Sequence, residues 1–381
     1  MTTFQILLSI AIAMFAMWMF FRLPVSASPL SLLINGFSGF FITNEHGGKP
    51  TPQRELTDDM RYKGVTPPAN TSNVHGEIEH IHGDIPVIHW YEQANETTYH
   101  FVTAGDPAKE AVVILPGLPE TWWAFHNQIA ELSTDHYVIA IDPQGYGQSD
   151  KRLTLNYTNQ SMAKDIATLL DNIGVDKFSL MGHDRGTVLT DHMTNVASLK
   201  GRIIRYVRMQ QSFNEPHGKP VPPHFLFKSK FGTAMFKSKN MVNIVYTSWF
   251  PSNLTYATIQ RLTHEFAFKG SAAAVSKYFE TTTFDIELED RHNYLFKSMT
   301  MPMLILQGKY DKGQHPAEYA QSPNFVSDAR VSFIEASHFL HLENPVATNG
   351  AIRKFFAETS TSAITENETL AKKITGGIKS K

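Results

Sequence analysis

Short apolar runs alternate with helix-length stretches through the middle of the chain. The runs are rich in Val and Ile, and between the second and third of them the apolar side chains of 159–173 recur at helical spacing. This alternation predicts an α/β fold, in which a mostly parallel central sheet is flanked by helices. The predicted strands are AVVILPG (111–117), YVIAID (137–142), FSLMGHD (178–184), IIRYVRM (203–209), MPMLILQG (301–308) and VSFIEAS (331–337).

The strand pattern stops between residues 213 and 298. An aromatic-rich stretch with helical periodicity replaces it until the next apolar strand pattern begins at 301. A mainly helical insertion between two strands lies over the carboxyl edge of the sheet, where open α/β folds bind their ligands. We therefore expect 213–298 to form a helical cap, or lid, over a core made of 97–212 and 299–357.

The N-terminal segment Phe4–Phe21 is mostly apolar and carries no charged side chain, and Arg22 is the first charged residue. As a helix it spans roughly 27 Å at about 1.5 Å per residue, which is marginally enough to cross a bilayer. The small residues at 25–27 also have the spacing of a signal-peptidase site. Residues 1–27 are therefore expected to be either a membrane anchor or a cleaved signal peptide, which makes the protein membrane-anchored or secreted (periplasmic).

Two other segments lack sustained periodicity. Residues 28–96 contain scattered Pro, Gly and His, and we expect them to form a strap packed on the core. Residues 358–381 are rich in Ser, Thr and Lys, which is typical of a solvated, flexible tail.

Composition excludes several classes of function. Among 381 residues, 34 Lys and Arg balance 36 Asp and Glu without a basic run, so nucleic-acid binding is disfavoured. The chain has no Cys, which removes thiol nucleophiles, disulfides and thiolate metal sites. Because the sequence also shows no metal-ligand motif and no dinucleotide-binding loop, we expect neither a metal nor a cofactor.

The sharpest chemical signal is GHDRG at 182–186, which follows the apolar run FSLM and opens a helical stretch. Small residues on both sides allow a tight strand-to-helix turn that presents the central side chain over the sheet, a position usually held by Ser. Here it is Asp184, a carboxylate that can attack saturated carbon and form an alkyl ester. The alternative is that Asp184 only caps the following helix.

Partners for Asp184 follow in the chain order nucleophile, acid, histidine. Asp311 comes after the strand MPMLILQG, and His338 comes after VSFIEAS. Asp311 would orient the imidazole, and His338 would draw a proton from water. We prefer His338 to its neighbour His341 because His338 lies at the end of the strand.

A Gly-containing turn, 115–122, follows the first of these strands. Such a turn can aim the backbone N–H of Leu118 at the site towards which the N–H of Arg185 also points. Together the two groups would form an oxyanion hole.

With these motifs the chain resembles the α/β-hydrolase superfamily, in the branch of epoxide hydrolases, haloalkane dehalogenases and fluoroacetate dehalogenases. The resemblance covers about 97–357 and rests on GHDRG, DPQGYGQSD (142–150), QGKYD (307–311) and SHFLHLENP (337–345). It implies that Asp184 forms the ester and that His338 with Asp311 directs water at it. It also implies a small apolar organic substrate, with water as the second reactant.

Departures from the dehalogenase patterns favour epoxide chemistry within the branch. Haloalkane dehalogenases typically have Trp after the nucleophile and an amide side chain in the oxyanion loop, where this chain has Arg185 and Leu118. Fluoroacetate dehalogenases carry a second Arg at the place held here by Val188. Epoxide hydrolases often read G-x-P-E-x-W in the oxyanion loop, which 117–122 match.

The resemblance also implies cap tyrosines that protonate the epoxide oxygen. Tyr278 occupies one such place, and Tyr246 is preferred to Tyr256 for the second. Trp122 and Trp249 complete the candidate substrate-binding residues. Two functions remain open: a hydrolase that works through an alkyl ester, with epoxide opening ahead of dehalogenation, and a non-catalytic ligand-binding protein that keeps the fold.

Overall fold

A computed structural model describes twelve parts of the chain. They are residues 39–41, 43–48, 54–59, 62, 64–211, 213, 226–238, 242, 245–249, 253–311, 322–326 and 328–359. Residues 1–27 and 360–381 lie outside them, so the anchor or signal segment and the tail stay predictions. Within the described residues, no helix has both the length and the apolar character needed to cross a membrane.

All six strand runs predicted from the sequence form strands, and so their prediction is confirmed. They are β4 (Ala111–Leu115), β5 (Tyr137–Ile141), β6 (Phe178–His183), β7 (Ile203–Met209), β8 (Met303–Gly308) and β9 (Ala329–Ile334). They pair in parallel in the order β5-β4-β6-β7-β8-β9. Their carboxyl ends therefore meet along one edge, where every predicted catalytic residue follows a strand.

The strap prediction for 28–96 is wrong in its last part, because the sheet begins before residue 97. Three antiparallel strands, β1 (Glu77–Ile81), β2 (Ile85–Ala94) and β3 (Thr97–Ala104), extend the sheet beside β5. Buried polar side chains hid their pattern. His89 and His100 lie inside the sheet with Nδ1 of the first 2.9 Å from Nε2 of the second.

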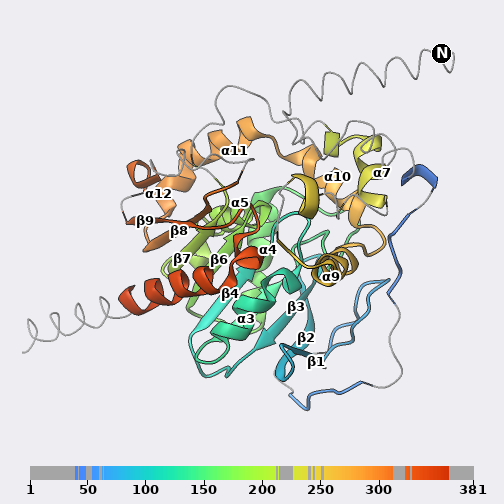
Figure 1. The fold of residues 1–381 in the computed structure, drawn as a ribbon, viewed down its shortest axis with the longest axis horizontal. Coiled ribbons are helices and arrows are strands. Elements are labelled where there is room, and N and C mark those ends of the chain that lie inside the picture. The colour runs from blue at the N-terminus through green and yellow to red at the C-terminus, as the bar shows by residue number, and fades with distance from the viewer. Residues whose placement is uncertain are drawn as a thin grey trace, which may run out of the picture.

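Helices cover both faces of the sheet (Figure 1). On one face, α4 (Asn159–Asn172) packs against α5 (Arg185–Met193). On the other, α3 (His126–Leu132) contacts a helix over 345–359 through Gln128 and Asn349, whose side chains hydrogen-bond at 2.9 Å. The predicted helix at 159–173 is confirmed, and Thr158 caps it by accepting a hydrogen bond from the N–H of Ser161.

The described part of 213–298 is helical and lies between β7 and β8, over the carboxyl edge of the sheet (Figure 1). Hydrogen bonds from Gln160 of the core to Asp290 (3.0 Å) and Tyr294 (2.9 Å) hold it in place. Its elements are α7 (Lys230–Lys237), the π-helical η3 (Val245–Trp249), α9 (Tyr256–Phe266), α10 (Ser271–Thr281), α11 (Phe284–Asp290), the π-helical η4 (Arg291–Leu295) and α12 (Phe296–Ser298).

Candidate active site

Asp184 sits in a strained turn between β6 and α5. Its φ of 48° and ψ of −118° place it outside the regions that non-glycine residues prefer. The neighbouring backbone approaches very closely: a Cβ on Gly186 would lie 2.2 Å from the carbonyl oxygen of Leu115, and one on Gly117 would lie 2.6 Å from the Cβ of Asp184. Only glycine fits these two positions, of which Gly186 belongs to the GHDRG motif and Gly117 to the turn at 115–122.

The side chain of Asp184 does not cap α5, so the helix-cap alternative is wrong. Its Oδ1 instead accepts a hydrogen bond of 3.1 Å from the N–H of Leu118. Its Oδ2 accepts one of 3.3 Å from Nε2 of Gln211 and lies 3.6 Å from Nε2 of His338. The two carboxylate oxygens thus face different partners.

The structure brings His338 and Asp311 to Asp184 from the loops after β9 and β8. Nδ1 of His338 lies 3.0 Å from Oδ2 of Asp311, and its Nε2 faces Asp184. All three residues converge at the carboxyl edge, although 154 positions separate the first from the last along the chain (338 − 184). His341, the competing histidine, points instead to Glu120.

Two carboxylates control the protonation of His338. Burial lowers the pKa of the imidazole, but the charges of Asp311 and Asp184 and the hydrogen bonds to them outweigh burial and raise the pKa to about 10. For Asp184, burial raises the pKa. The hydrogen bond to His338 and the charges of His338 and Arg185 outweigh burial, so the pKa lies below its usual value. The resting site therefore holds an aspartate anion beside an imidazolium at neutral pH.

The loop after β4 carries Leu118, whose N–H is predicted to be an oxyanion donor. The N–H of Leu118 reaches Asp184 directly. The backbone of Gly117 also approaches the nitrogen of Arg185, since a Cβ on Gly117 would lie 3.1 Å from it. Both predicted donors therefore belong to segments that meet at the nucleophile.

Sequence reasoning missed two glutamines that support the site. Gln210 accepts a hydrogen bond of 2.9 Å from the N–H of Gly308 and donates one to Oδ2 of Asp311. Gln211 donates to Asp184. Both follow the last residue of β7, Met209, so their place at a strand's carboxyl end was the available signal.

Tyr278 joins the core through the side chain of Arg185. Its hydroxyl oxygen accepts hydrogen bonds from Nε (3.2 Å) and Nη2 (3.0 Å) of Arg185, and its proton is donated to Oδ1 of Asn159 (3.2 Å). Arg185 also pairs with the buried carboxylate of Glu287. Burial raises the pKa of Tyr278, while the positive charge of Arg185 opposes that shift.

The other candidate substrate-binding residues divide into two groups. Tyr246 is fully buried, donates to the carbonyl oxygen of Pro119 at 3.2 Å, and packs on Phe339, next to His338. Tyr256 is 76% exposed, so Tyr246 is the better second cap tyrosine. For Trp122 the prediction needs correction, because its buried ring packs edge-on against His89 in the core. The side chain of Trp249 lies outside the described part of the structure.

One group of side chains among the described residues has the spacing of metal ligands. Glu120, His183 and His341 are fully buried, and their nearest oxygen and nitrogen atoms lie within 4.8 Å of one another. Nothing in the sequence pattern predicted this cluster.

Comparisons with known proteins agree with this geometry. A family model described as the alpha/beta hydrolase fold matches residues 110–200. Human Epoxide hydrolase 4 is 35% identical over 92 residues, which cover 24% of this chain and 25% of that protein. Epoxide hydrolase 3 of Xenopus tropicalis is 24% identical over 323 residues, which cover 77% of this chain and 82% of that protein. The chain thus matches about a quarter of the human relative's length.

Solved structures show the same fold. The epoxide hydrolase CorEH, without ligand, has a TM-score of 0.58 and 21% identity, covering 71% of this chain and 99% of that one. A haloalkane dehalogenase loop variant from Bradyrhizobium elkanii has a TM-score of 0.62 and 19% identity, covering 74% and 99%. The chain therefore has the α/β-hydrolase fold, and its residues 110–200 are similar to that family. Epoxide hydrolases and haloalkane dehalogenases are among the proteins it resembles.

Proposed function

We propose that the protein is a hydrolase that opens a small apolar epoxide to a diol through a covalent ester on Asp184. The observation that carries this proposal is that the two oxygens of the Asp184 carboxylate have different partners. Oδ1 is held by the N–H of Leu118, and Oδ2 lies beside the imidazole of His338. These contacts support Oδ1 as the oxyanion of the ester and Oδ2 as the attacking atom.

In the first step, Oδ2 of Asp184 attacks an epoxide carbon, and the carbon–oxygen bond of the ring breaks. The electron pair of that bond goes to the epoxide oxygen, which takes a proton from the hydroxyl of Tyr278. Arg185 supports this transfer because its two N–H donors already lie on the phenolic oxygen, where negative charge would develop.

In the second step, Nε2 of His338 takes a proton from water, and the hydroxide attacks Cγ of Asp184. The N–H of Leu118 stabilises the charge that develops on Oδ1. Cleavage of the Cγ–Oδ2 bond then leaves the electron pair on Oδ2, which takes the proton of the added hydroxyl group, so that the diol is released and the carboxylate is restored. Asp311 stabilises the imidazolium throughout.

The surroundings of Arg185 support an epoxide over a haloacid. Its charge is already paired with Glu287, so it is less suited to bind a substrate carboxylate. Dehalogenation remains the second candidate, because haloalkane dehalogenases share the fold and the same triad can displace a halide. The pair of halide donors expected from that family is replaced by Leu118 and a tyrosine-bound Arg185.

The experiment that tests the proposal is a turnover screen of the purified protein against terminal epoxides and against chlorinated, brominated and fluorinated compounds. Diol formation and halide release are recorded in parallel. Diol without halide supports epoxide hydrolysis. Halide release without diol from epoxides selects dehalogenation, and binding without either product selects the non-catalytic alternative.

The two chemical steps are expected to respond differently to pH. Alkylation needs Asp184 in its ionised form. Burial opposes ionisation, but His338 outweighs burial and keeps the pKa of Asp184 low. The alkylation rate should therefore stay constant from about pH 6 to about pH 9. In the ester the charge of Asp184 is gone, which removes one cause of the raised pKa of His338 and lowers that pKa from about 10. Because hydrolysis needs the neutral imidazole, its rate should rise with pH and level off.

Single-turnover rates of ester formation and ester loss across this pH range give the measurement. A hydrolysis rate that does not change with pH would show that His338 is not the base.

We also propose that Phe4–Phe21 attaches the protein to a membrane. Its apolar composition and its lack of charged side chains support a retained span. The full chain is expected in the membrane fraction after a high-salt wash, while a chain that begins at Ser28 stays in the supernatant. Mature protein whose N-terminal sequence starts at Ser28 would contradict the anchor and indicate a cleaved signal.

A further inference from the structure

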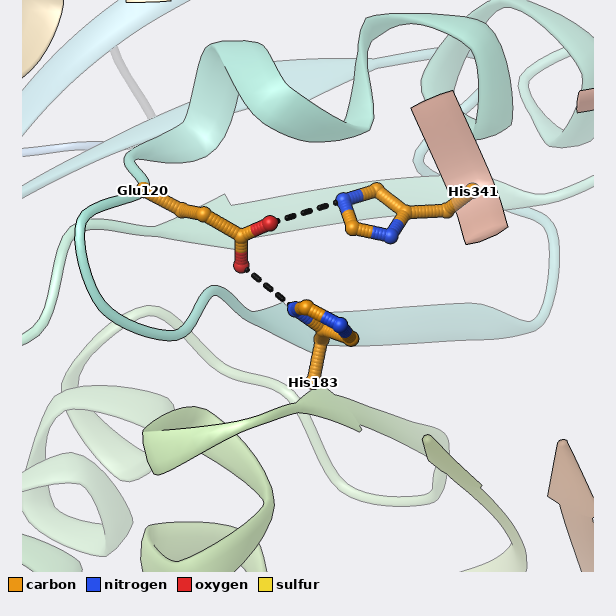
Figure 2. Close-up of side chains that lie close together, drawn as sticks. All are labelled: Glu120, His183 and His341. Atoms are coloured by element: carbon orange, nitrogen blue, oxygen red, sulfur yellow. Dashed lines mark hydrogen bonds and ion pairs between the residues drawn. The ribbon is translucent and has the colours of Figure 1, made fainter. Parts of the chain in front are cut away.

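Behind the catalytic side chains, Glu120 lies between two histidines (Figure 2). Its Oε2 accepts a hydrogen bond of 2.8 Å from Nδ1 of His183 and another of 2.7 Å from the N–H of Gly117. Its Oε1 lies 3.0 Å from Nε2 of His341. All three side chains are fully buried, so solvent does not satisfy any of these groups.

The partners of His183 fix its charge. Its Nδ1 faces the carboxylate of Glu120, and its Nε2 lies 3.0 Å from the backbone carbonyl oxygen of His338. A carbonyl oxygen can only accept a hydrogen bond, and Oε2 of Glu120 already accepts one from Gly117. Both nitrogens of His183 must therefore carry protons, which makes the ring an imidazolium paired with Glu120.

The same contacts argue against a bound cation. Two N–H groups are directed at Oε2 of Glu120, so this oxygen is already satisfied without a metal. Burial raises the pKa of Glu120, but the charge of His183 and the hydrogen bond to it outweigh burial and hold the pKa well below its usual range. Burial lowers the pKa of His341 to about 4, so that ring is neutral and His183 alone balances the carboxylate.

The cluster joins three segments that must keep their relative positions during the reaction. Through Gly117 it contacts the loop whose next residue, Leu118, supplies the oxyanion donor. Through the ring of His183 it holds the backbone directly before Asp184, because His183 is the preceding residue. Through the carbonyl oxygen of His338 it holds the backbone of the base.

We propose that Glu120, His183 and His341 form a buried positioning cluster, which aligns the oxyanion loop and the base for hydrolysis of the ester. The inference rests on the proposed function and adds to it residues that touch no substrate. Ester hydrolysis needs both the Leu118 donor and His338, whereas ester formation needs the anion of Asp184 and the acid Tyr278. Disturbing the cluster therefore slows the second step more than the first.

The kinetic test uses Glu120→Gln, which keeps the shape of the side chain and removes the charge that pairs with His183. The single-turnover rate of ester hydrolysis is expected to fall about 10- to 100-fold, because a displacement of catalytic groups by up to about 1 Å has an effect of this size. The rate of ester formation is expected to change by less than about 3-fold. His192→Gln is the matched control, because it removes a buried histidine that faces another carboxylate, Asp290, at 3.6 Å. Equal slowing of both steps, or of neither, in folded Glu120→Gln protein would overturn the proposal.

A second measurement needs neither substrate nor a folded variant of Glu120. Nitrogen NMR of ¹⁵N-histidine-labelled wild-type protein at neutral pH should show imidazolium signals from both His183 and His338, and the signal of His183 is assigned by its loss in His183→Gln. A neutral His183 ring would overturn the proposal while leaving the proposed function untouched. So would elemental analysis that finds a stoichiometric divalent metal in wild-type protein and none in His341→Gln protein. Conversely, an imidazolium at His183 in a protein that opens no epoxide would retain the ion pair and reject the proposed function.

Discussion

Replacing His338 with Gln is expected to leave ester formation intact and to stop ester hydrolysis, so that alkylated Asp184 accumulates. The reason is that Asp184 attacks as an anion and needs no base, whereas water must lose a proton before it attacks the ester. Loss of a general base typically costs 10²- to 10⁴-fold, and we expect a decrease of about 10³-fold in the hydrolysis rate.

Intact-protein mass spectrometry after substrate addition measures this directly. The variant should carry the mass of one substrate molecule, while wild-type protein returns to its free mass. Circular dichroism checks that the fold is retained, since His338 is buried and its ring contacts Phe339. An unmodified mass in a folded variant, with a substrate that wild-type protein turns over, would contradict the roles given to both Asp184 and His338.

The second large effect is expected from Tyr278→Phe. An epoxide oxygen leaves as an alkoxide unless an acid protonates it, and the neutral phenol supplies that proton. Removal of the hydroxyl should slow epoxide opening by about 10- to 1000-fold, comparable to the loss of one donor to an oxyanion. An alkyl halide needs no proton, so its displacement should slow much less.

Single-turnover rates of ester formation with both substrate types, in both proteins, make this comparison. Tyr294→Phe serves as the control, because Tyr294 is also a cap tyrosine but contacts Gln160 at the edge of the cap. The loss of the hydroxyl also removes the donor to the buried Oδ1 of Asn159 and an acceptor for Arg185, which keeps its pair with Glu287, and this costs about 1 to 3 kcal/mol of stability. Thermal unfolding therefore accompanies the kinetics. Unchanged epoxide opening in folded Tyr278→Phe protein would assign this residue to cap packing.

The parallel strands and the position of Asp184 could be predicted from local sequence. Buried parallel strands are continuous apolar runs, such as β4 and β6, because both faces of the sheet are covered. The turn at Asp184 leaves a local mark as well, since only glycine tolerates the approach of Leu115 to Gly186. Both features leave a mark within one short stretch of sequence, an apolar run or a flanking glycine, which can be recognised without knowing the distant partner.

Features that depend on distant partners could not be predicted in the same way. His89 and His100 interrupt the apolar pattern of β2 and β3, because each satisfies the other across the sheet. Glu120 is a loop residue whose role becomes visible only when His183 and His341 lie beside it. The support of Asp311 by Gln210 likewise joins two loops that are 101 residues apart.

The raised pKa of His338 determines how many protons the reaction exchanges with the solvent. The resting site stores one proton on the imidazole, and that proton is retained because Asp184 and Asp311 are both charged. Formation of the ester removes one of these charges and frees the proton for Tyr278 to recover after it has protonated the epoxide oxygen. Epoxide hydrolysis thus runs with no net exchange of protons with the solvent, whereas displacement of a halide would release one proton for each molecule converted.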